Sequence, residues 1–446
     1  MKKGVLTFEK VAFIALVFVP FLICWIAYYE PYTLTTGSKQ VSTLLFFILI
    51  SVCYYFCHRL DGFRVTFVQI RDLILGQVLA IAITDALAYV LIWMLSIHMP
   101  NLIPGLICFA AQCGISAAWS YIVHRDFFAK NDSLKSVVVF DERRGLDELI
   151  GEYGLEKRFE IIGTYRIEEI IDKLDLLSSA DAVFLCGISS HERNIILKHC
   201  TYNDINLYLM PTIGDAMMSG AERLHMLHLP ILKCQRYNPG IEYLLIKRLM
   251  DVVFSGIALI ITSPVFLVTA IAIKSDGGPV FYKQTRLTKD GKTFEVIKFR
   301  SMCVDAEKLS GAILSAGEDD PRITKVGKKI RAYRIDELPQ LLNIIKGEMS
   351  IVGPRPERPE IEAEIVKELP EFALRLQTKA GLTGYAQVYG KYNTTFYDKL
   401  LMDLMYISKP SILEDFVIMI ATLKILFAKE STEGIGEEAK VLKSRD

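Results

Sequence analysis

The sequence predicts a membrane protein with three parts: a four-helix transmembrane domain, a Rossmann-like parallel α/β domain, and an α-rich monotopic domain with a re-entrant membrane helix. Hydrophobic residues make up 52% of its 446 residues, and the mean hydropathy of +0.31 is too high for an ordinary soluble protein. Long apolar runs fill the first part, and strand and helix patterns alternate in the second. We place the boundaries at 1–130, 131–240 and 241–430, with a tail at 431–446 that we expect to be disordered.

The composition narrows the classes of partner. The 51 Lys and Arg residues balance the 51 Asp and Glu residues, so attraction to anions must come from local clusters, and we expect no nucleic-acid partner. The nine cysteines show neither a CxxC pair nor a zinc-binding spacing, which indicates buried thiols in a reducing compartment. We interpret His225 and His228 as structural. No histidine follows them, so a catalytic site further along the chain must work without an imidazole base.

Four apolar runs, at about 11–29, 42–57, 73–97 and 102–122, are each near the length that crosses a bilayer. The opposite loops hold only Lys39. Basic residues lie before the first run, between the second and third, and after the fourth: Lys2, Lys3, Lys10, Arg59, Arg64, Arg71, Arg125, Lys130 and Lys135. The positive-inside rule therefore predicts that both ends of this unit are cytoplasmic, in the plasma membrane.

The second part alternates strand and helix patterns. We predict strands at 136–140, 181–187 and 206–211, a helical stretch near 145–156, and a helix that starts at Ser189 or Ser190. This order is typical of a small parallel α/β domain. After the first strand, where a dinucleotide site would place GxGxxG, the chain has acidic residues, which disfavours cofactor binding. We expect a role in regulation or in homodimer formation, through this domain or the membrane helices.

The next apolar run is long enough to span a membrane, but we predict a re-entrant helix over 247–274. Basic residues flank both of its ends, and Pro264 lies at its midpoint after Ser263. Proline removes a helical hydrogen bond and bends the helix, and the Ser263 hydroxyl can satisfy the freed backbone group. The alternative is a fifth spanning helix with a kink, which would place the rest of the chain outside the cell.

The segment from Arg334 to Gly347 carries the adjacent carboxylates Asp336 and Glu337. Pro339 is interpreted as the first residue of a helix, so the acidic pair precedes a helix N-terminus, a position that binds anions. A phosphate could approach if one carboxylate held Mg²⁺ and nearby arginines neutralised the remaining charge. The alternative is a solvated acidic turn. The motifs that surround the pair bear on this choice.

Several motifs surround this pair. Residues 284–302 predict a basic β-hairpin with its turn at 288–292, from which Lys298 and Arg300 project toward phosphate or anionic lipid. Residues 350–360 form a proline-stiffened loop that carries Arg355, and residues 379–390 a glycine-rich loop with room for a close ligand. A helix over 410–429 is predicted to lie on the membrane or in the core.

Six stretches together resemble a known family: SPVF (263–266), GGPVFYKQTRL (277–287), KFRSM (298–302), DDPRITKVGKKIRAYRIDELPQLLN (319–343), GEMSIVGPRP (347–356) and GLTGYAQV (381–388). The family is that of the polyprenyl-phosphate glycosyl-1-phosphate transferases, which initiate bacterial capsule, exopolysaccharide or O-antigen synthesis. The chain is similar to the long form, which carries a four-helix unit and an α/β domain before the catalytic domain.

The resemblance implies transfer of a sugar-1-phosphate from a UDP-sugar to undecaprenyl phosphate, at the cytoplasmic face of a bacterial inner membrane. It implies that Asp336 is the nucleophile and that Glu337 binds Mg²⁺. As binding groups for the substrate phosphates we name Lys298, Arg300, Arg322, Arg331 and Arg355. Two alternatives remain: direct transfer with both carboxylates as Mg²⁺ ligands, and a membrane sensor without activity. The sequence does not name the sugar or the polysaccharide.

Overall fold

The structure, a computed structural model, describes residues 3–34, 39–141, 143–152, 154–226, 228–275, 277–303, 322–390, 394–426 and 443–444. It divides into two compact units, Met1–Leu209 with Ser444–Asp446, and Met210–Lys443. The tail predicted at 431–446 lies outside the described residues except for β12 (Lys443–Ser444), which pairs with β2 (Arg143–Arg144).

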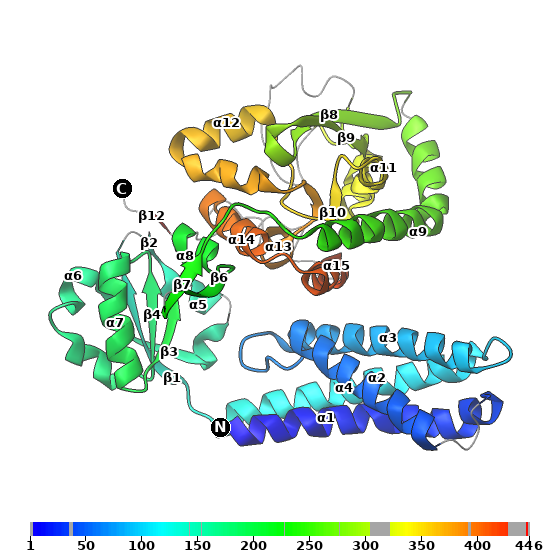
Figure 1. Cartoon of the computed structure of the whole chain (residues 1–446), viewed down its shortest axis with the longest axis horizontal. Helices are drawn as coiled ribbons and strands as arrows, with labels where there is room; N and C mark the ends of the chain where they lie inside the picture. The colour runs from blue at the N-terminus through cyan, green and yellow to red at the C-terminus, as the bar shows by residue number, and fades with distance from the viewer. Residues whose placement is uncertain are drawn as a thin grey trace. The chain divides into compact units, whose positions relative to one another are not determined.

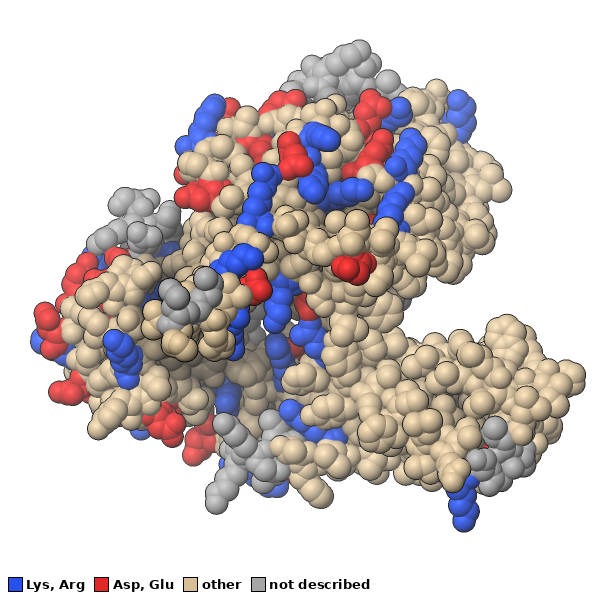
Figure 2. Space-filling view, viewed as in Figure 1, with Lys and Arg blue, Asp and Glu red and all other residues tan. Residues whose placement is uncertain are grey.

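The first unit begins with four long helices, α1 (Lys3–Cys24), α2 (Lys39–Arg59), α3 (Ile70–Leu95) and α4 (Leu102–Lys130). All four are long and apolar enough to cross a membrane, which confirms the predicted apolar helices. They lie side by side in Figure 1, and their visible face in Figure 2 carries almost no charged side chain. Helix α4 runs past the predicted apolar stretch because its polar end stays helical, where Lys130 pairs with Asp126 at 2.6 Å.

A parallel sheet with the order β3-β1-β4-β5 follows, which confirms the α/β prediction. The strands are β1 (Leu134–Phe140), β3 (Phe159–Arg166), β4 (Ala182–Cys186) and β5 (Asn206–Leu209). The helices between them are α5 (Leu146–Glu152), α6 (Ile167–Ile170) and α7 (Ser190–Tyr202), and Ser189 caps α7 as expected. The sequence prediction missed β3, in which buried or half-buried residues alternate with exposed ones.

The second unit begins with α8 (Ile213–Met218) and the hairpin of β6 (Glu222–Met226) and β7 (Leu229–Lys233). His225 lies on β6 and His228 follows it in the turn, and no cluster of three or more metal-binding side chains occurs among the described residues. All nine cysteines are free; six are buried, but Cys234 and Cys303 are exposed.

Helix α9 (Ile241–Lys274) is continuous through Ser263 and Pro264, where the sequence predicted a helix break, and it is bent rather than interrupted. Figure 1 shows the ribbon turning a corner within this 34-residue helix, which would be about 51 Å long if straight. Pro264 has no amide to offer the carbonyl of Ile260, and the Ser263 hydroxyl donates to that carbonyl at 2.8 Å instead. The chain on both sides of the bend packs on the same unit: Arg248 bonds to carbonyls of α11, and Phe266 packs against Phe299.

The rest of the unit surrounds a small parallel pair, β10 (Ser350–Val352) and β11 (Gly381–Thr383). The predicted hairpin is present as β8 (Phe281–Leu287) and β9 (Thr293–Phe299). The helices are α10 (Lys325–Ala332), α11 (Gln340–Lys346), α12 (Pro359–Glu368), α13 (Tyr385–Tyr389), α14 (Phe396–Ser408) and α15 (Ile412–Leu426), with a 3₁₀ helix, η7, at Pro370–Gln377. Of the two places predicted for the 410–429 helix, α15 occupies the core, where Val417 and Ile418 are fully buried.

The glycine-rich loop differs from the expectation. A side chain on Gly353, Gly381 or Gly384 would meet backbone atoms at 2.2–2.4 Å, because these residues lie against one another across β10 and β11. The glycines therefore let two backbones approach, and they leave no room for a ligand at that crossing.

Candidate active site

The acidic pair lies on a short 3₁₀ turn, η6 (Ile335–Glu337), between α10 and α11. Arg334 just before it has φ of 53°, a left-handed conformation that reverses the chain after α10. Pro339 takes the N-cap position of α11, which begins at Gln340, one residue after the predicted helix start. The predicted arrangement of two carboxylates immediately before a helix is therefore present.

Three cations face Glu337. Its Oε1 accepts hydrogen bonds from Arg355 at 2.8 Å and from Lys298 at 3.2 Å, and Arg334 lies 3.8 Å from its Oε2. Burial alone would raise the pKa of Glu337, but the charges of Arg355, Lys298 and Arg334 more than offset it and hold the pKa well below its ordinary value. Glu337 is therefore a permanent anion at neutral pH.

Asp336 has the opposite environment. Within the part of the chain that the structure describes, its carboxylate accepts no hydrogen bond and forms no ion pair within 4 Å. Burial and the neighbouring charge of Glu337 raise its pKa, while Lys298, Arg331 and Arg355 oppose the shift. A carboxylate with free lone pairs and little solvation suits nucleophilic attack on phosphorus.

Lys298 reaches the pair from β9, and Asn343 fixes β9 against α11. The fully buried amide of Asn343 accepts from the Ile297 amide at 3.0 Å and donates to the Glu295 carbonyl at 2.7 Å. These two bonds bracket the strand residues just before Lys298. Strand and helix therefore hold Lys298 and the acidic pair in one register.

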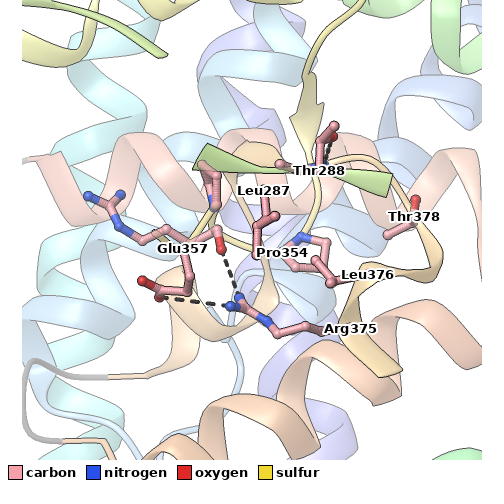
Figure 3. Close-up of a pocket in the computed structure, with 10 residues that line it drawn as sticks. Leu287, Thr288, Pro354, Glu357, Arg375, Leu376 and Thr378 are labelled. Carbon is pink, nitrogen blue, oxygen red and sulfur yellow. Dashed lines mark hydrogen bonds and ion pairs between the residues drawn. The ribbon is translucent and has the colours of Figure 1, made fainter. Parts of the chain in front are cut away.

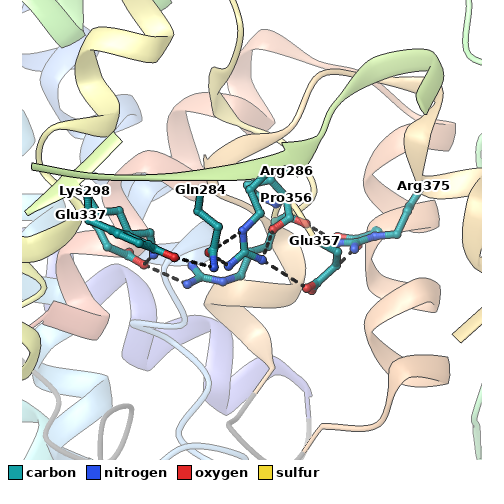
Figure 4. A network of polar contacts seen from close by, with 10 residues as sticks. Gln284, Arg286, Lys298, Glu337, Pro356, Glu357 and Arg375 are labelled. Carbon is teal, nitrogen blue, oxygen red and sulfur yellow. Dashed lines mark hydrogen bonds and ion pairs between the residues drawn. The ribbon is translucent and has the colours of Figure 1, made fainter. Parts of the chain in front are cut away.

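Figure 4 shows a network of polar contacts between Glu337 and Arg375, and Arg355 links these two residues. The guanidinium of Arg375 donates to the Arg355 carbonyl at 2.9 Å and pairs with Asp403 at 2.8 Å, and both members of that pair are almost fully buried. Glu357 lies 3.8 Å from both Arg375 and Arg286. Arg286 also donates to Gln284 at 2.6 Å. The chain fixes the loop that carries Arg355.

A small pocket lies beside this loop, and Figure 3 shows Arg375 and Glu357 on one side of it and Thr378 on the other. Thr288 donates to the Glu348 carbonyl and accepts from the Ala380 amide, so its hydroxyl is already engaged. Pro354 and Leu376 give the rest of the wall an apolar character. The pocket is part of the support beneath Arg355.

The structure does not bring all predicted residues together. Lys298 and Arg355 contact Glu337, and Arg331 acts on Asp336 through its charge. Arg300 is buried elsewhere: its guanidinium donates to the carbonyls of Pro279 and Ile273, which joins β9 to the end of α9. Arg322 contributes a backbone carbonyl that accepts from the Cys303 amide.

The sequence reasoning missed Arg286, Arg375, Glu357 and Asp403. Arg286 and Glu357 lie in or next to the motifs already singled out, so a signal for them was present. Arg375 and Asp403 lie in separate helical stretches, and no local pattern joins them.

The acidic pair supplies two carboxylates, so substrate phosphates and water would have to complete the shell of a magnesium ion there. No group of three or more metal-binding side chains occurs among the described residues, but magnesium often takes one or two carboxylates and completes its shell with water and phosphate oxygens. The unpaired carboxylate of Asp336 and the weakly engaged Oε2 of Glu337 leave oxygens for it. The donor set therefore fits the ion.

Residues 242–429 match the family described as bacterial sugar transferase. An exopolysaccharide production protein, ExoY, from Sinorhizobium fredii is 39% identical over 191 residues, which are 40% of this chain and 83% of the relative. The chain belongs to the bacterial sugar transferase family. The matched region contains α9, the acidic pair and the loop of Arg355, so the site described above lies within it.

Other relatives of this sugar transferase extend the match. A UDP-N-acetylgalactosamine-undecaprenyl-phosphate N-acetylgalactosaminephosphotransferase from Aeromonas hydrophila is 35% identical over 234 residues, 52% of this chain and 54% of the relative. A UDP-glucose:undecaprenyl-phosphate glucose-1-phosphate transferase from Klebsiella pneumoniae is 39% identical over 183 residues, 40% of this chain and 39% of the relative. The alignments span about half the length of several such relatives.

Proposed function

We propose that this sugar transferase moves a sugar-1-phosphate from a UDP-sugar to undecaprenyl phosphate, giving undecaprenyl-diphospho-sugar and UMP. The observation that carries the proposal is the unpaired carboxylate of Asp336 beside Glu337, which Lys298 and Arg355 hold. The names of the relatives supply the substrate classes, since two are transferases that act on undecaprenyl phosphate. The product would begin synthesis of a surface polysaccharide.

The proposed reaction has two displacements. An Asp336 oxygen attacks the β-phosphorus of the UDP-sugar, the bond from that phosphorus to the bridging oxygen breaks, and UMP leaves. A phosphate oxygen of undecaprenyl phosphate then attacks the same phosphorus, which forms the diphosphate and returns Asp336 to its carboxylate. Both nucleophiles are already anionic at neutral pH, so neither step needs a general base.

The cations have separate roles in this scheme. Lys298, Arg331 and Arg355 lie where they offset the charge that a diphosphate brings to two carboxylates. A magnesium ion held by Glu337 and substrate phosphates would stabilise the departing UMP as a Lewis acid. Because Arg300 is committed to backbone carbonyls, we assign it to holding β9 rather than to phosphate.

The test offers the purified protein UDP-glucose, UDP-galactose and UDP-N-acetylgalactosamine with magnesium, and measures UMP. We expect release with at least one sugar. Without undecaprenyl phosphate we expect a burst of one UMP per active site, since the covalent step needs no lipid. Direct transfer would show no burst. No UMP from any sugar, with lipid present, would overturn the proposal.

We propose that α9 is re-entrant and that the second unit faces the cytoplasm. The bend of α9 and the packing of both of its halves on one unit support this. Exposed apolar residues around the bend, including Ile260 at 75% and Val268 at 68%, would then contact lipid.

The topology prediction uses single cysteines at the two ends of α9, Ile241→Cys and Ser275→Cys, in a protein whose exposed Cys234 and Cys303 are serine. A membrane-impermeant maleimide should label both positions from the cytoplasmic side only. Labelling of the two ends from opposite sides would show a fifth spanning helix instead. A cysteine at Lys39, on the predicted outer loop, is the control for outside labelling.

We also propose that two copies associate through the first unit. The supporting observation is that the α/β sheet and four-helix bundle lie outside the family region 242–429, and that the short relative ExoY matches only 40% of this chain, which leaves the first unit for a role other than transfer. The mass of the detergent-solubilised protein should correspond to a dimer, and deletion of residues 1–240 should give a monomer.

A further inference from the structure

Glu362 is a buried acid that the proposed reaction does not use. It lies on α12 with only 5% of its surface exposed, and neither carboxylate oxygen has a hydrogen-bond partner in the described structure. The helix packs through Ile365 into an apolar cluster with Phe372 and Leu401. An ionised carboxylate is costly in such surroundings, because nothing replaces the water that it loses.

The charged groups around Glu362 come from three neighbouring segments. Arg375 faces it from η7, Asp403 from α14, and Glu357 from the loop before α12. Lys399 of α14 faces Glu357 and Asp403 in turn. Burial is the main cause that raises the pKa of Glu362; Arg375 opposes it, the charges of Glu357 and Asp403 add to it, and the net pKa is about 7. Glu362 thus changes charge close to physiological pH.

Arg375 connects this acid to the active site. Its guanidinium is shared among Asp403 at 2.8 Å, the Arg355 carbonyl at 2.9 Å and Glu357 at 3.8 Å. Arg355 in turn donates to Glu337 at 2.8 Å. A third negative charge beside Arg375 competes with the Arg355 carbonyl for the guanidinium, because Arg375 is buried and has no solvent to share.

We propose that Glu362 is a positioning residue whose protonation state controls how firmly Arg355 is held against Glu337. Neutral Glu362 leaves Arg375 bound to the Arg355 carbonyl, and ionised Glu362 draws Arg375 away, which loosens the loop. This inference rests on the proposed function. In the profile of rate against pH, the fall at high pH would then come from ionisation of Glu362, outside the acidic pair. The fall at low pH would come from protonation of Asp336.

The test compares UMP release from pH 5 to pH 9 in the wild type, Glu362→Gln and Glu360→Gln, the last being an exposed acid on the same helix. The ionised fraction of a group with a pKa of about 7 rises about tenfold between pH 6 and pH 8. We expect the rate of Glu362→Gln relative to wild type to rise by up to that factor over this range, with an unchanged acidic limb. The Glu360→Gln profile should match the wild type.

Thermal melting measures the ionisation of Glu362 independently of enzyme activity. Unfolded glutamate has a pKa of about 4.3, so between that value and the folded pKa the native state binds more protons. The unfolding free energy of the wild type therefore falls as pH rises through this window. Glu362→Gln should melt higher than the wild type at pH 8, and the difference should shrink at pH 5.

The outcomes separate the two proposals. UMP release with the same alkaline limb in Glu362→Gln, or a melting difference that does not depend on pH, would overturn the role of Glu362 and leave the reaction intact. No UMP from any protein at any pH would overturn both.

Discussion

Asp336→Asn is expected to lower UMP release by a factor on the order of 10⁴ or more, because an amide cannot displace UMP and loss of a nucleophile removes the whole covalent route. The measurement is single-turnover UMP release with and without undecaprenyl phosphate. The burst should vanish completely. A labelled sugar phosphate should remain attached to the wild type after rapid quenching, and not to the variant.

The same substitution should make the protein more stable. The raised pKa of Asp336 shows that its folded site disfavours the charged form, so the carboxylate destabilises the fold at neutral pH. An uncharged amide of the same shape removes that cost, and the melting temperature should rise. Asp290→Asn, at an exposed hairpin residue that pairs with Arg236, is the matched control and should keep full activity. Normal activity in Asp336→Asn would exclude the covalent route.

Asp415→Asn is expected to lower the unfolding free energy of the second unit by about 3–5 kcal/mol, because it removes the ion-pair partner of the buried Lys247 ammonium. Lys247 lies 2.9 Å from Asp415, and their side chains are 10% and 2% exposed. Tyr406 and Tyr243 donate to the same carboxylate, at 2.7 and 2.9 Å. This pair fastens α9 to α14 and α15, so its loss should detach the membrane helix.

A second ion pair of the same length provides the control. Lys283 and Glu295 also lie 2.9 Å apart, but their side chains are 59% and 61% exposed. Glu295→Gln should cost less than about 1 kcal/mol, since water screens this pair. Thermal melting in detergent measures both. Equal losses for the two variants would contradict the role given to burial. The double variant Lys247→Met, Asp415→Leu should recover part of the stability.

The sequence predicted those parts of the fold that depend on local patterns. Long apolar runs indicated the long helices. The alternation of strand patterns with helix patterns in the second part indicated β1, β4 and β5. The serine and proline at the middle of α9 predicted both a bend and the hydroxyl that satisfies Ile260. Strand β3 was missed because its apolar alternation is broken: Ile162 stands on the exposed side and Gly163 on the inward side.

The site was predicted only where its chemistry is local. Asp336 and Glu337 are neighbours in sequence, and a proline follows them, so their place before a helix could be read directly. The sequence placed Arg300 beside Lys298 on one face of the hairpin, but β9 ends at Phe299, so the period of the strand no longer governs the next side chain. Arg375 and Asp403 meet only through the packing of η7 on α14. Because the two residues are far apart in the sequence, their pairing could not be predicted from a local pattern.

The role of the glycine-rich loop also could not be predicted from the sequence. A glycine serves equally where a ligand approaches and where two backbones touch, and composition does not distinguish these uses. The positions of Gly353 and Gly381 across β10 and β11 show that these glycines serve the close contact of two backbones.

The amide of Asn343 has a consequence for how the enzyme can diversify. Its hydrogen bonds tie β9 to α11. They therefore hold Lys298 of β9 and the acidic turn before α11 in one rigid unit, which contains the groups proposed to act on phosphate. In the proposed reaction, the groups of this unit act on phosphate and not on the sugar. Under the proposed function, we therefore expect chimeras that exchange other loops of the catalytic region with those of a relative, while keeping Asn343, to inherit the turnover of one parent and the sugar preference of the other.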